Sequence, residues 1–415
     1  MAKLHTIALG CQMSAADSAE MARPLLARGL VPTSVAGDAD AIVINTCTVR
    51  QHAEDRALSL IGSLKPWKEA DPRRVLIVAG CAAERLKDWL EKRFPYIDLV
   101  VGARSIEQYP ALLDRAVTDR FAPETPSPAP APLPEGSPAT AYLTIMRGCN
   151  YAFSYCIVPS VRGPELYRPV SAIVDEAAQR IAEGAKEITL LGQTVNSYHG
   201  EYQGRKVNFG DLLRILDAVP GLLRLRFMSP HPYYVDESMA QAMADCRTVC
   251  QQLHLPAQSG SDRLLKLMRR NYSRRSFLSK ARMVNLLLPR VVLSTDIIVG
   301  FPTETEEEFK ESLSLVSELG PSAAYCFKYS PRQSTESAAW PDDVPQEVKE
   351  ERLARLNEVV DRLTEQALRW QIGRTVEVLD EEAGYGRTRE GFNVRWEASQ
   401  SLPGRLTKVR ITGAT

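Results

Sequence analysis

The sequence predicts an α/β protein built from three folded parts. Apolar, strand-like runs alternate with amphipathic, helix-like runs from residue 1 to about residue 118, and again from 141 to about 340. A stretch rich in Pro, Ala and Ser separates the two series, at residues 121–140. Residues 371–415 hold short strand patterns with glycines at the turns. We therefore expect an N-terminal α/β domain with a parallel sheet, a partial or full β/α barrel, and a small C-terminal β-barrel.

In the N-terminal part, a cysteine follows each of the first three predicted strands. The strands are expected at residues 6–9, 41–45, 75–79 and 98–101, with helices at 16–28, 49–64 and 83–93. Cys11, Cys47 and Cys81 come directly after the first three strands. Parallel strands end at a common edge, where α/β folds bind ligands, so we expect the three thiols to converge.

Each of these cysteines, taken alone, is well explained as a small buried apolar side chain. Three of them at equivalent strand ends favour the other interpretation, which is an iron–sulfur cluster held by three thiolates with one open iron. The long spacings between the cysteines disfavour a structural zinc site.

The second series predicts six strands, at residues 141–145, 187–191, 223–227, 252–256, 291–298 and 324–329. Six strand–helix units fit a β/α barrel better than an open sheet. Polar or glycine-bearing segments follow these strands, at residues 149–156, 192–196, 229–232, 258–261, 300–306 and 329–332. Each segment alone is an ordinary turn, but together they form a ring of candidate ligand-binding groups.

A charged, amphipathic helix is expected at residues 342–370, and the residues after it combine basic and aromatic side chains. Arg387, Arg389 and Arg395 lie near Tyr385, Phe392 and Trp396. Such a mixture on a small β-barrel suits RNA binding through phosphate contacts and base stacking. Acidic residues nearly balance the basic ones, so composition alone does not decide for binding.

The composition favours a cytosolic protein without membrane segments. The 415 residues include 51 basic and 51 acidic ones, so net charge does not indicate a nucleic-acid partner. The N-terminus lacks the basic head and long apolar core of a signal peptide, and no apolar run approaches the roughly 20 residues that span a bilayer. In a reducing compartment the eight cysteines are expected as thiols or metal ligands.

Eight motifs, in this order along nearly the whole chain, give it a close resemblance to the radical-SAM methylthiotransferase family, where SAM is S-adenosylmethionine. They are Gly10-Cys11-Gln12-Met13, Asn45 to Arg50, Gly80-Cys81-Ala82, Arg147 to Gly163, Leu191 to Tyr198, Gln258 to Ser261, Asp296 to Pro302, and Tyr329-Ser330-Pro331-Arg332. Val49-Arg50 with Ala53-Glu54, and the last motif, are most similar to the tRNA-modifying MiaB branch.

The resemblance implies domains at 1–120 (auxiliary cluster), 141–345 (radical-SAM barrel) and 371–415 (an RNA-binding TRAM domain), joined by a linker at 121–140 and a helix at 346–370. It implies two [4Fe–4S] clusters, one on Cys11, Cys47 and Cys81 and one on the loop that holds Cys149 and Cys156. It also implies SAM contacts, at Tyr155, Gly192, Gln193, Ser259, Ser261, Asp296 and Gly300, and RNA contacts at Arg332, Arg387, Arg389 and Arg395.

The implied reaction adds a methylthio group to C2 of N6-isopentenyladenosine at tRNA position 37. One electron cleaves SAM, the 5′-deoxyadenosyl radical removes the hydrogen, and the N-terminal cluster presents or donates sulfur; a second SAM supplies the methyl group. The expected partners are the tRNA anticodon stem-loop and a flavodoxin-like or ferredoxin-like electron donor, and the protein is expected to be a cytoplasmic monomer. Branches that modify threonylcarbamoyladenosine or a ribosomal protein are alternatives.

One departure from the family pattern bears on activity. The cluster loop of the family reads C-x-x-x-C-x-aromatic-C, and Phe153 stands at its middle cysteine position. We expect this substitution to remove one thiolate and impair the barrel cluster, so that only the N-terminal cluster forms unless Phe153 is replaced by cysteine. The alternatives are an inactive tRNA-binding homologue and a functional enzyme in which another group replaces the missing ligand. Smaller departures include Thr303, which stands where glycine is usual.

Overall fold

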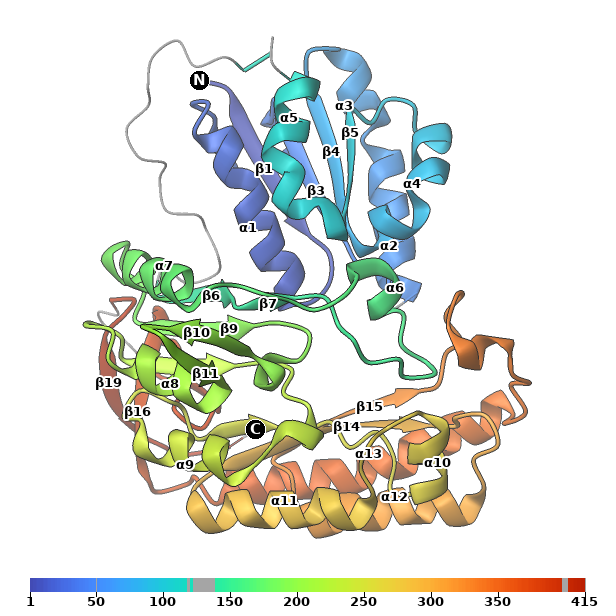
Figure 1. Cartoon of the computed structure of the whole chain (residues 1–415), viewed down its shortest axis with the longest axis vertical. Coiled ribbons are helices and arrows are strands. Elements are labelled where there is room, and N and C mark those ends of the chain that lie inside the picture. Colours follow the sequence, from blue (N-terminus) through green and yellow to red (C-terminus); the bar gives the residue numbers. More distant parts are fainter. Residues whose placement is uncertain (50, 118–119, 122–138, 398–401, 415) are drawn as a thin grey trace. The chain divides into compact units, whose positions relative to one another are not determined.

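Figure 1 shows the computed structural model, which describes residues 1–49, 51–117, 120–121, 139–397 and 402–414. Almost all of the stretch predicted as a linker therefore lies outside the described residues. The chain forms two compact units. The N-terminal unit comprises Met1–Glu135, Gly148–Asn150 and Ile157–Glu165, and the barrel unit comprises Gly136–Arg147, Tyr151–Cys156 and Leu166–Thr415.

The N-terminal unit has the predicted parallel sheet, with helices on both faces in a three-layer α/β/α sandwich (Figure 1). The strands in spatial order are β2 (Val31–Pro32), β1 (Lys3–Ala8), β3 (Ala41–Thr46), β4 (Val75–Gly80) and β5 (Leu99–Gly102). The helices are α1 (Gln12–Leu26), α2 (Gln51–Ser63), α3 (Lys65–Ala70), α4 (Cys81–Arg93) and α5 (Tyr109–Val117), with short 3₁₀ turns at Ala36–Asp38 and Ala103–Gln108.

Alternating strand residues divide the apolar core of this unit between the two faces of the sheet. Val43 and Ile77 pack with α1 and α5 on one face, whereas Ile44 and Val78 pack with α2, α3 and α4 on the other. Both sets are fully buried, which explains why β3 and β4 read as continuous apolar runs rather than alternating ones. The two-residue strand β2 was not predicted, because so short a strand leaves no periodic pattern.

The barrel unit is organised by six parallel strands that follow one another in sequence order. They are β6 (Thr140–Thr144), β9 (Glu187–Leu191), β12 (Arg224–Phe227), β13 (Gln252–His254), β14 (Val292–Val299) and β15 (Ala323–Lys328). A bridge between Leu225 and Val249 joins the first three strands to the last three. No strand pairing within the described residues joins β6 to β15, so the barrel is partial, which was one of the two expected forms.

Helices cover the outside of this partial barrel and bury a large apolar core, beside a smaller cluster of Leu264, Met268, Phe301 and Tyr329. They are α7 (Val170–Ala182), α8 (Phe209–Asp217), α9 (Glu237–Asp245), α10 (Asp262–Leu267), α11 (Arg274–Leu287), α12 (Glu306–Leu319) and α13 (Gln346–Arg369). Two small ribbons are added to it: β7 (Met146–Arg147) with β8 (Leu166–Tyr167), and β10 (His199–Tyr202) with β11 (Arg205–Asn208). The short helix α6 (Val158–Arg162) belongs to the N-terminal unit.

The last part of the barrel unit is a four-stranded antiparallel sheet, which we call the C-terminal sheet. Its strands, in spatial order, are β18 (Asn393–Arg395), β17 (Tyr385–Thr388), β16 (Thr375–Glu382) and β19 (Leu406–Arg410). Arg224 and Arg226, at the amino-terminal end of the barrel strands, donate hydrogen bonds to main-chain oxygens of this sheet. The sheet is therefore held at the end of the barrel opposite to the strand carboxyl ends.

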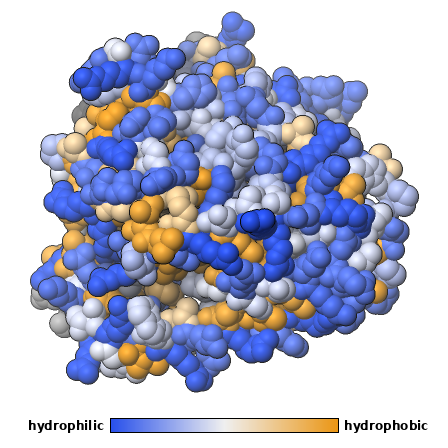
Figure 2. Space-filling model, turned by 60° about the horizontal axis from the view of Figure 1, so that its bottom comes forward, coloured by the Kyte–Doolittle hydropathy of each residue, from blue (hydrophilic) through white to orange (hydrophobic). Residues whose placement is uncertain are grey.

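No helix among the described residues is long and apolar enough to cross a membrane. On the face drawn in Figure 2, hydrophobic residues form separate patches among hydrophilic ones.

Candidate functional site

The three N-terminal cysteines occupy equivalent positions at the carboxyl edge of the parallel sheet. Cys11 is the N-cap residue of α1, directly after the turn that follows β1, and Cys81 is the first residue of α4. Cys47 follows β3, which is the neighbour of β1 at the point where the strand order reverses. Such reversal points are where open α/β sheets bind their ligands. The sequence-based prediction of one common edge thus agrees with the topology.

Close packing holds the cysteine loops together. A Cβ atom on Gly10 would lie 2.6 Å from Cβ of Cys47 and 3.2 Å from its Sγ, so only glycine lets the first loop approach the second. Asn45 is fully buried, and neither polar atom of its side-chain amide has a hydrogen-bond partner among the described residues. An orphaned buried amide two residues before Cys47 is a polar group available to a bound cofactor.

A buried arginine accompanies the cysteines. Nε of Arg162 lies 3.3 Å from Sγ of Cys81, and Nη2 donates to a carboxylate oxygen of Asp17 at 2.9 Å. Burial raises the pKa of the Cys81 thiol to about 11, and the nearby Arg162 guanidinium opposes this rise. Burial alone would lower the pKa of Arg162, but Asp17, Cys81 and Cys11 raise it above its usual range. The guanidinium therefore stays charged beside the thiols.

These residues fit an iron–sulfur cluster better than a single metal ion. No group of three His, Cys, Asp or Glu side chains in the described part of the chain is close enough to hold one ion. A [4Fe–4S] cluster makes a different demand, because each thiolate binds a different iron. Three cysteine loops at one sheet edge, an unpaired buried amide and a fixed cation supply the ligands and polar groups that such a cluster uses.

In the barrel unit, Phe153 is part of a stack of rings at the position where the family pattern has a cysteine. Its ring lies 5.1 Å from Tyr151 and 5.5 Å from His231, nearly parallel to both. The guanidinium of Arg270 lies over the same ring, at 3.9 Å from its centroid. The loop around Phe153 therefore packs as an aromatic and cationic cluster. The residues present here do not fit a [4Fe–4S] cluster held by three thiolates.

Arg270 and His231 both have unsatisfied buried nitrogens in this cluster. Nη2 of Arg270 donates to the hydroxyl of Tyr155 at 2.5 Å, while its Nε has no partner in the described residues. Nδ1 of His231 accepts from the amide of Tyr233, and its buried Nε2 likewise lacks a partner among the residues described. Burial, with Arg270 and Lys280, lowers the pKa of His231 to about 3, so the imidazole is neutral at physiological pH.

Tyr155, predicted to lie near the adenine of SAM, has a buried apolar setting. Its ring packs against Phe301 and beside Leu264, Met268 and Tyr329. Burial raises the pKa of its hydroxyl, and the adjacent Arg270 guanidinium opposes that rise. Asp296, on β14, contributes to the same electrostatic environment, and its carboxylate lies 3.3 Å from Nε2 of His254.

The two predicted glycines follow β9 and β14, at strand carboxyl ends. A Cβ on Gly192 would lie 2.4 Å from Cγ of Met146, and one on Gly300 would lie 2.3 Å from Cγ of Lys349. Gly300 also has φ +68° and donates its amide to Glu304 at 2.6 Å. Next to Gly192, Oε1 of Gln193 is buried without a hydrogen-bond partner in the described residues. Gln193 therefore has an unused acceptor.

The two predicted serines are engaged in the loop's own structure. Ser261 caps α10 and donates to Glu308 at 2.9 Å, while Ser259 accepts from the amide of Ser261 at 3.1 Å. A Cβ on Gly260, between them, would lie 2.3 Å from the main-chain oxygen of Glu311. This loop is thus packed tightly on α12, and its hydroxyls already have partners.

The structure separates the predicted RNA-binding arginines into two groups. Arg389 donates to the main-chain oxygens of Arg247 and Val249, and Arg387 contacts the buried Glu187 at 3.3 Å, so both attach the C-terminal sheet to the barrel. Arg395 is exposed on β18, and Arg332 is partly exposed in the loop after β15.

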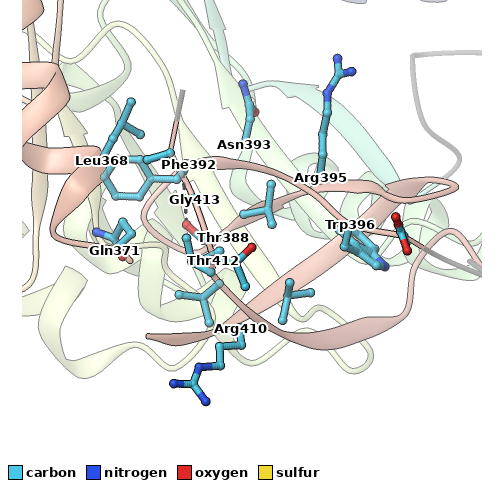
Figure 3. Close-up of a pocket in the computed structure, with 16 residues that line it drawn as sticks. Leu368, Gln371, Thr388, Phe392, Asn393, Arg395, Trp396, Arg410, Thr412 and Gly413 are labelled. Atoms are coloured by element: carbon cyan, nitrogen blue, oxygen red, sulfur yellow. Dashed lines mark hydrogen bonds between the residues drawn. The ribbon is translucent and has the colours of Figure 1, made fainter. Parts of the chain in front are cut away.

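Arg395 also borders a cavity of about 540 Å³, lined by Phe392, Trp396 and the end of α13 (Figure 3). In Figure 3, Arg395 and Arg410 point in opposite directions, away from its centre.

Sequence reasoning missed Arg162, Asp17, Asn45 and Arg270 as parts of these sites, whereas His231 lies in the candidate segment 229–232. Arg162 and Asn45 lie within quoted motifs, which could have drawn attention to them, but their contacts come from residues distant in sequence. Asp17 lies in a helix whose buried face is not evident from its composition.

Two protein families match separate stretches of the chain. Residues 3–102 match "Uncharacterized protein family UPF0004", and residues 143–316 match the "Radical SAM superfamily". The first match covers the sheet that carries the cysteine trio, and the second covers most of the partial barrel. Together with the fold they place the protein in the class of radical-SAM enzymes. This class implies a [4Fe–4S] cluster and SAM as cofactors.

Curated relatives narrow the class to a family. The chain is 39% identical over 420 residues to tRNA-2-methylthio-N(6)-dimethylallyladenosine synthase from Clostridium botulinum (strain Loch Maree / Type A3), covering 98% of this chain and 93% of that protein. It is 42% identical over 418 residues to the synthase of the same name from Sorangium cellulosum (strain So ce56), covering 93% and 84%. The chain belongs to the family of the tRNA-2-methylthio-N(6)-dimethylallyladenosine synthases.

Solved structures support the fold at low sequence identity. The radical S-adenosylmethionine methyltransferase TsrM from Kitasatospora setae, solved with cobalamin and a [4Fe-4S] cluster bound, aligns with a TM-score of 0.60 at 14% identity. The alignment covers 81% of this chain and 77% of TsrM. The cobalamin-dependent enzyme OxsB aligns with a TM-score of 0.53 at 12% identity over 96% of this chain.

Proposed function

We propose that this protein is a tRNA methylthiotransferase of the radical-SAM type, acting on N6-isopentenyladenosine at position 37 of the anticodon stem-loop. The observation that carries the proposal is full-length identity of about 40% to synthases named for this reaction. The cysteine trio at one sheet edge supports it, because this reaction needs a sulfur source that the barrel alone does not provide.

Within this proposal, Cys11, Cys47 and Cys81 hold the N-terminal cluster, which supplies sulfur chemistry when bound. Gln193 and Asp296 are the proposed polar contacts of SAM, because Gln193 has an unused buried acceptor and Asp296 is partly exposed. Tyr155, Gly192 and Gly300 shape the site, and Ser259 and Ser261 hold the loop before α10 in place.

For RNA, we assign Arg395 and Arg332 as contacts and Arg387 and Arg389 as docking residues. We separate these two pairs because the guanidinium groups of Arg387 and Arg389 already bind main-chain oxygens and a carboxylate of the protein, whereas Arg395 and Arg332 are at least partly exposed. We also expect the protein to act as a cytoplasmic monomer with a flavodoxin-like or ferredoxin-like reductant, which light scattering and reduction assays with purified donors can check.

We further propose that Phe153 impairs the barrel cluster of this chain. Cys149 and Cys156 supply two thiolates of the three in the family pattern, and the Phe153 ring packs between Arg270 and the neighbouring rings. A cluster bound by fewer thiolates is weaker, and replacing the ring by a thiol restores the third ligand.

The test is expression in cells that lack their own methylthiotransferase, followed by mass spectrometry of tRNA nucleosides. The Phe153→Cys variant is expected to produce the 2-methylthio nucleoside, and the native chain at least tenfold less. Equal amounts from both would refute the impairment. If neither forms product while both still bind the anticodon stem-loop, the protein is a tRNA-binding homologue and not a methylthiotransferase.

A further inference from the structure

Arg162 is a buried cation in direct contact with one cysteine of the trio. Its side chain is 4% exposed, and that of its partner Asp17 is fully buried. The two hydrogen bonds use different nitrogens, since Nε faces Sγ of Cys81 and Nη2 faces Asp17. The third nitrogen, Nη1, is buried with no hydrogen-bond partner among the residues described.

Two contacts fix the Arg162 guanidinium beside the cysteine trio. Asp17 lies on α1, six residues after Cys11, so the carboxylate that anchors Arg162 comes from the same helix whose N-cap is another cysteine of the trio. Arg162 also interacts electrostatically with Cys11 as well as with Cys81. A charged donor held in this way cannot turn away without breaking its ion pair with the buried Asp17 carboxylate.

We propose that Arg162 is a positioning residue of the N-terminal cluster, donating a charged hydrogen bond to the Cys81 thiolate and thereby raising the reduction potential of the cluster. The inference rests on the proposed function, which places a cluster on Cys11, Cys47 and Cys81. A positive charge beside a cluster favours the added electron, and hydrogen bonds to ligand sulfur act in the same direction. Arginine suits this role because it remains charged when buried and can serve two acceptors at once.

Substitutions at Arg162 separate this role from simple packing. Arg162→Met removes both the charge and the hydrogen bonds, whereas Arg162→Lys keeps the charge but cannot reach Asp17 and Cys81 with the same planar geometry. Lys68→Met is the matched control. Lys68 forms a buried ion pair with Asp98 at 2.7 Å in the same unit, at the amino edge of the sheet and so away from the cysteines.

The experiment is a redox titration, followed by electron paramagnetic resonance, of the full chain after anaerobic reconstitution with iron and sulfide. At the potential where the native cluster is half reduced, Arg162→Met is expected to lower the ratio of reduced to oxidised cluster at least tenfold, about 59 mV for a one-electron couple. Arg162→Lys should give a smaller shift, and Lys68→Met none despite its loss of stability. If Arg162→Met does not fold, Arg162→Lys decides.

An unchanged potential at full iron content would overturn the role of Arg162. A higher iron content in Arg162→Met than in the native chain would also overturn it, because Arg162 would then compete with the cluster for its space. A native chain that binds no iron would overturn the proposed function itself, and this inference with it. Iron content and potential therefore distinguish the two failures.

Discussion

We expect the replacement of Phe153 by cysteine to lower stability and to raise metal binding, and the two effects can be measured separately. The perturbation is Phe153→Cys, with Phe153→Ser as the matched variant that removes the same ring without supplying a thiolate. In the metal-free protein both variants lose the contacts of the ring. Only the cysteine variant gains a third ligand in the loop between Cys149 and Cys156.

The size of the stability loss follows from the contacts of the ring. The Arg270 guanidinium at 3.9 Å contributes about 1–2 kcal/mol as a largely desolvated cation–π pair. The stacked contacts with Tyr151 and His231 contribute about 0.5–1.5 kcal/mol, and apolar burial of the half-buried ring adds about 1 kcal/mol. We expect the free energy of unfolding of both metal-free variants to be about 3 kcal/mol lower than that of the native chain.

Urea denaturation of the metal-free proteins measures this loss, which corresponds to a midpoint shift of about 1 M for a slope near 3 kcal/mol/M. Anaerobic reconstitution then compares iron content. Phe153→Cys should bind about four iron atoms per chain more than Phe153→Ser, which is one additional cluster. Equal iron contents in the two variants would refute our interpretation of position 153. Native-like stability of Phe153→Ser would refute the ring stack as a stabilising contact.

Three further predictions concern the barrel unit. Thr303 has φ +68°, a backbone conformation that strains a β-branched residue, so Thr303→Gly should raise the free energy of unfolding by about 1 kcal/mol in urea denaturation. The control Thr305→Gly removes the N-cap of α12 at φ −84° and should lower the free energy of unfolding. The pKa of His231 falls from 6.5 to about 3 on folding, so between these pH values the unfolded chain binds more protons than the folded one. The free energy of unfolding should therefore rise by about 1.4 kcal/mol per pH unit in this range. The same pH dependence of stability in His231→Gln would contradict this prediction. Arg226→Met leaves the charge of the buried Glu187 less compensated, and should lower the free energy of unfolding by about 3 kcal/mol and speed proteolysis of the C-terminal sheet. The control Arg395→Met, at an exposed position, should change the free energy of unfolding by less than about 0.5 kcal/mol. Equal effects of the two substitutions would argue against attachment of the sheet through Arg226.

The positions of most strands along the chain and the edge that carries the cysteines could be predicted because they depend on local patterns. Apolar runs such as 41–45 and 75–79 became β3 and β4 almost unchanged, and β/α alternation fixed the positions of Cys47 and Cys81 at their carboxyl ends. The contacts of Arg162 and Arg270 could not be predicted, because they join residues far apart in sequence. Arg162 reaches Cys81 and Asp17 across 81 and 145 residues, and Arg270 reaches Phe153 from a different strand–helix unit.

The roles of the C-terminal arginines show the same limit. Arg387, Arg389 and Arg395 are equivalent in a composition that alternates basic and aromatic residues. Only the docking of the sheet against Glu187 and the segment around Val249 distinguishes them. A pattern can therefore indicate an RNA-binding surface without telling which of its cations are already used by the protein.

The hydrogen bonds that hold the C-terminal sheet are made mostly to its main chain. Arg224 and Arg226 bind the carbonyl oxygens of residues 377, 387, 388 and 389, and these oxygens are present whatever side chains the sheet carries. Side chains on the outward face, such as Arg395, can thus be exchanged without loosening the attachment. The same barrel can accept sheets of different surface chemistry, which makes this end of the molecule a practical place to redesign surface charge and polarity.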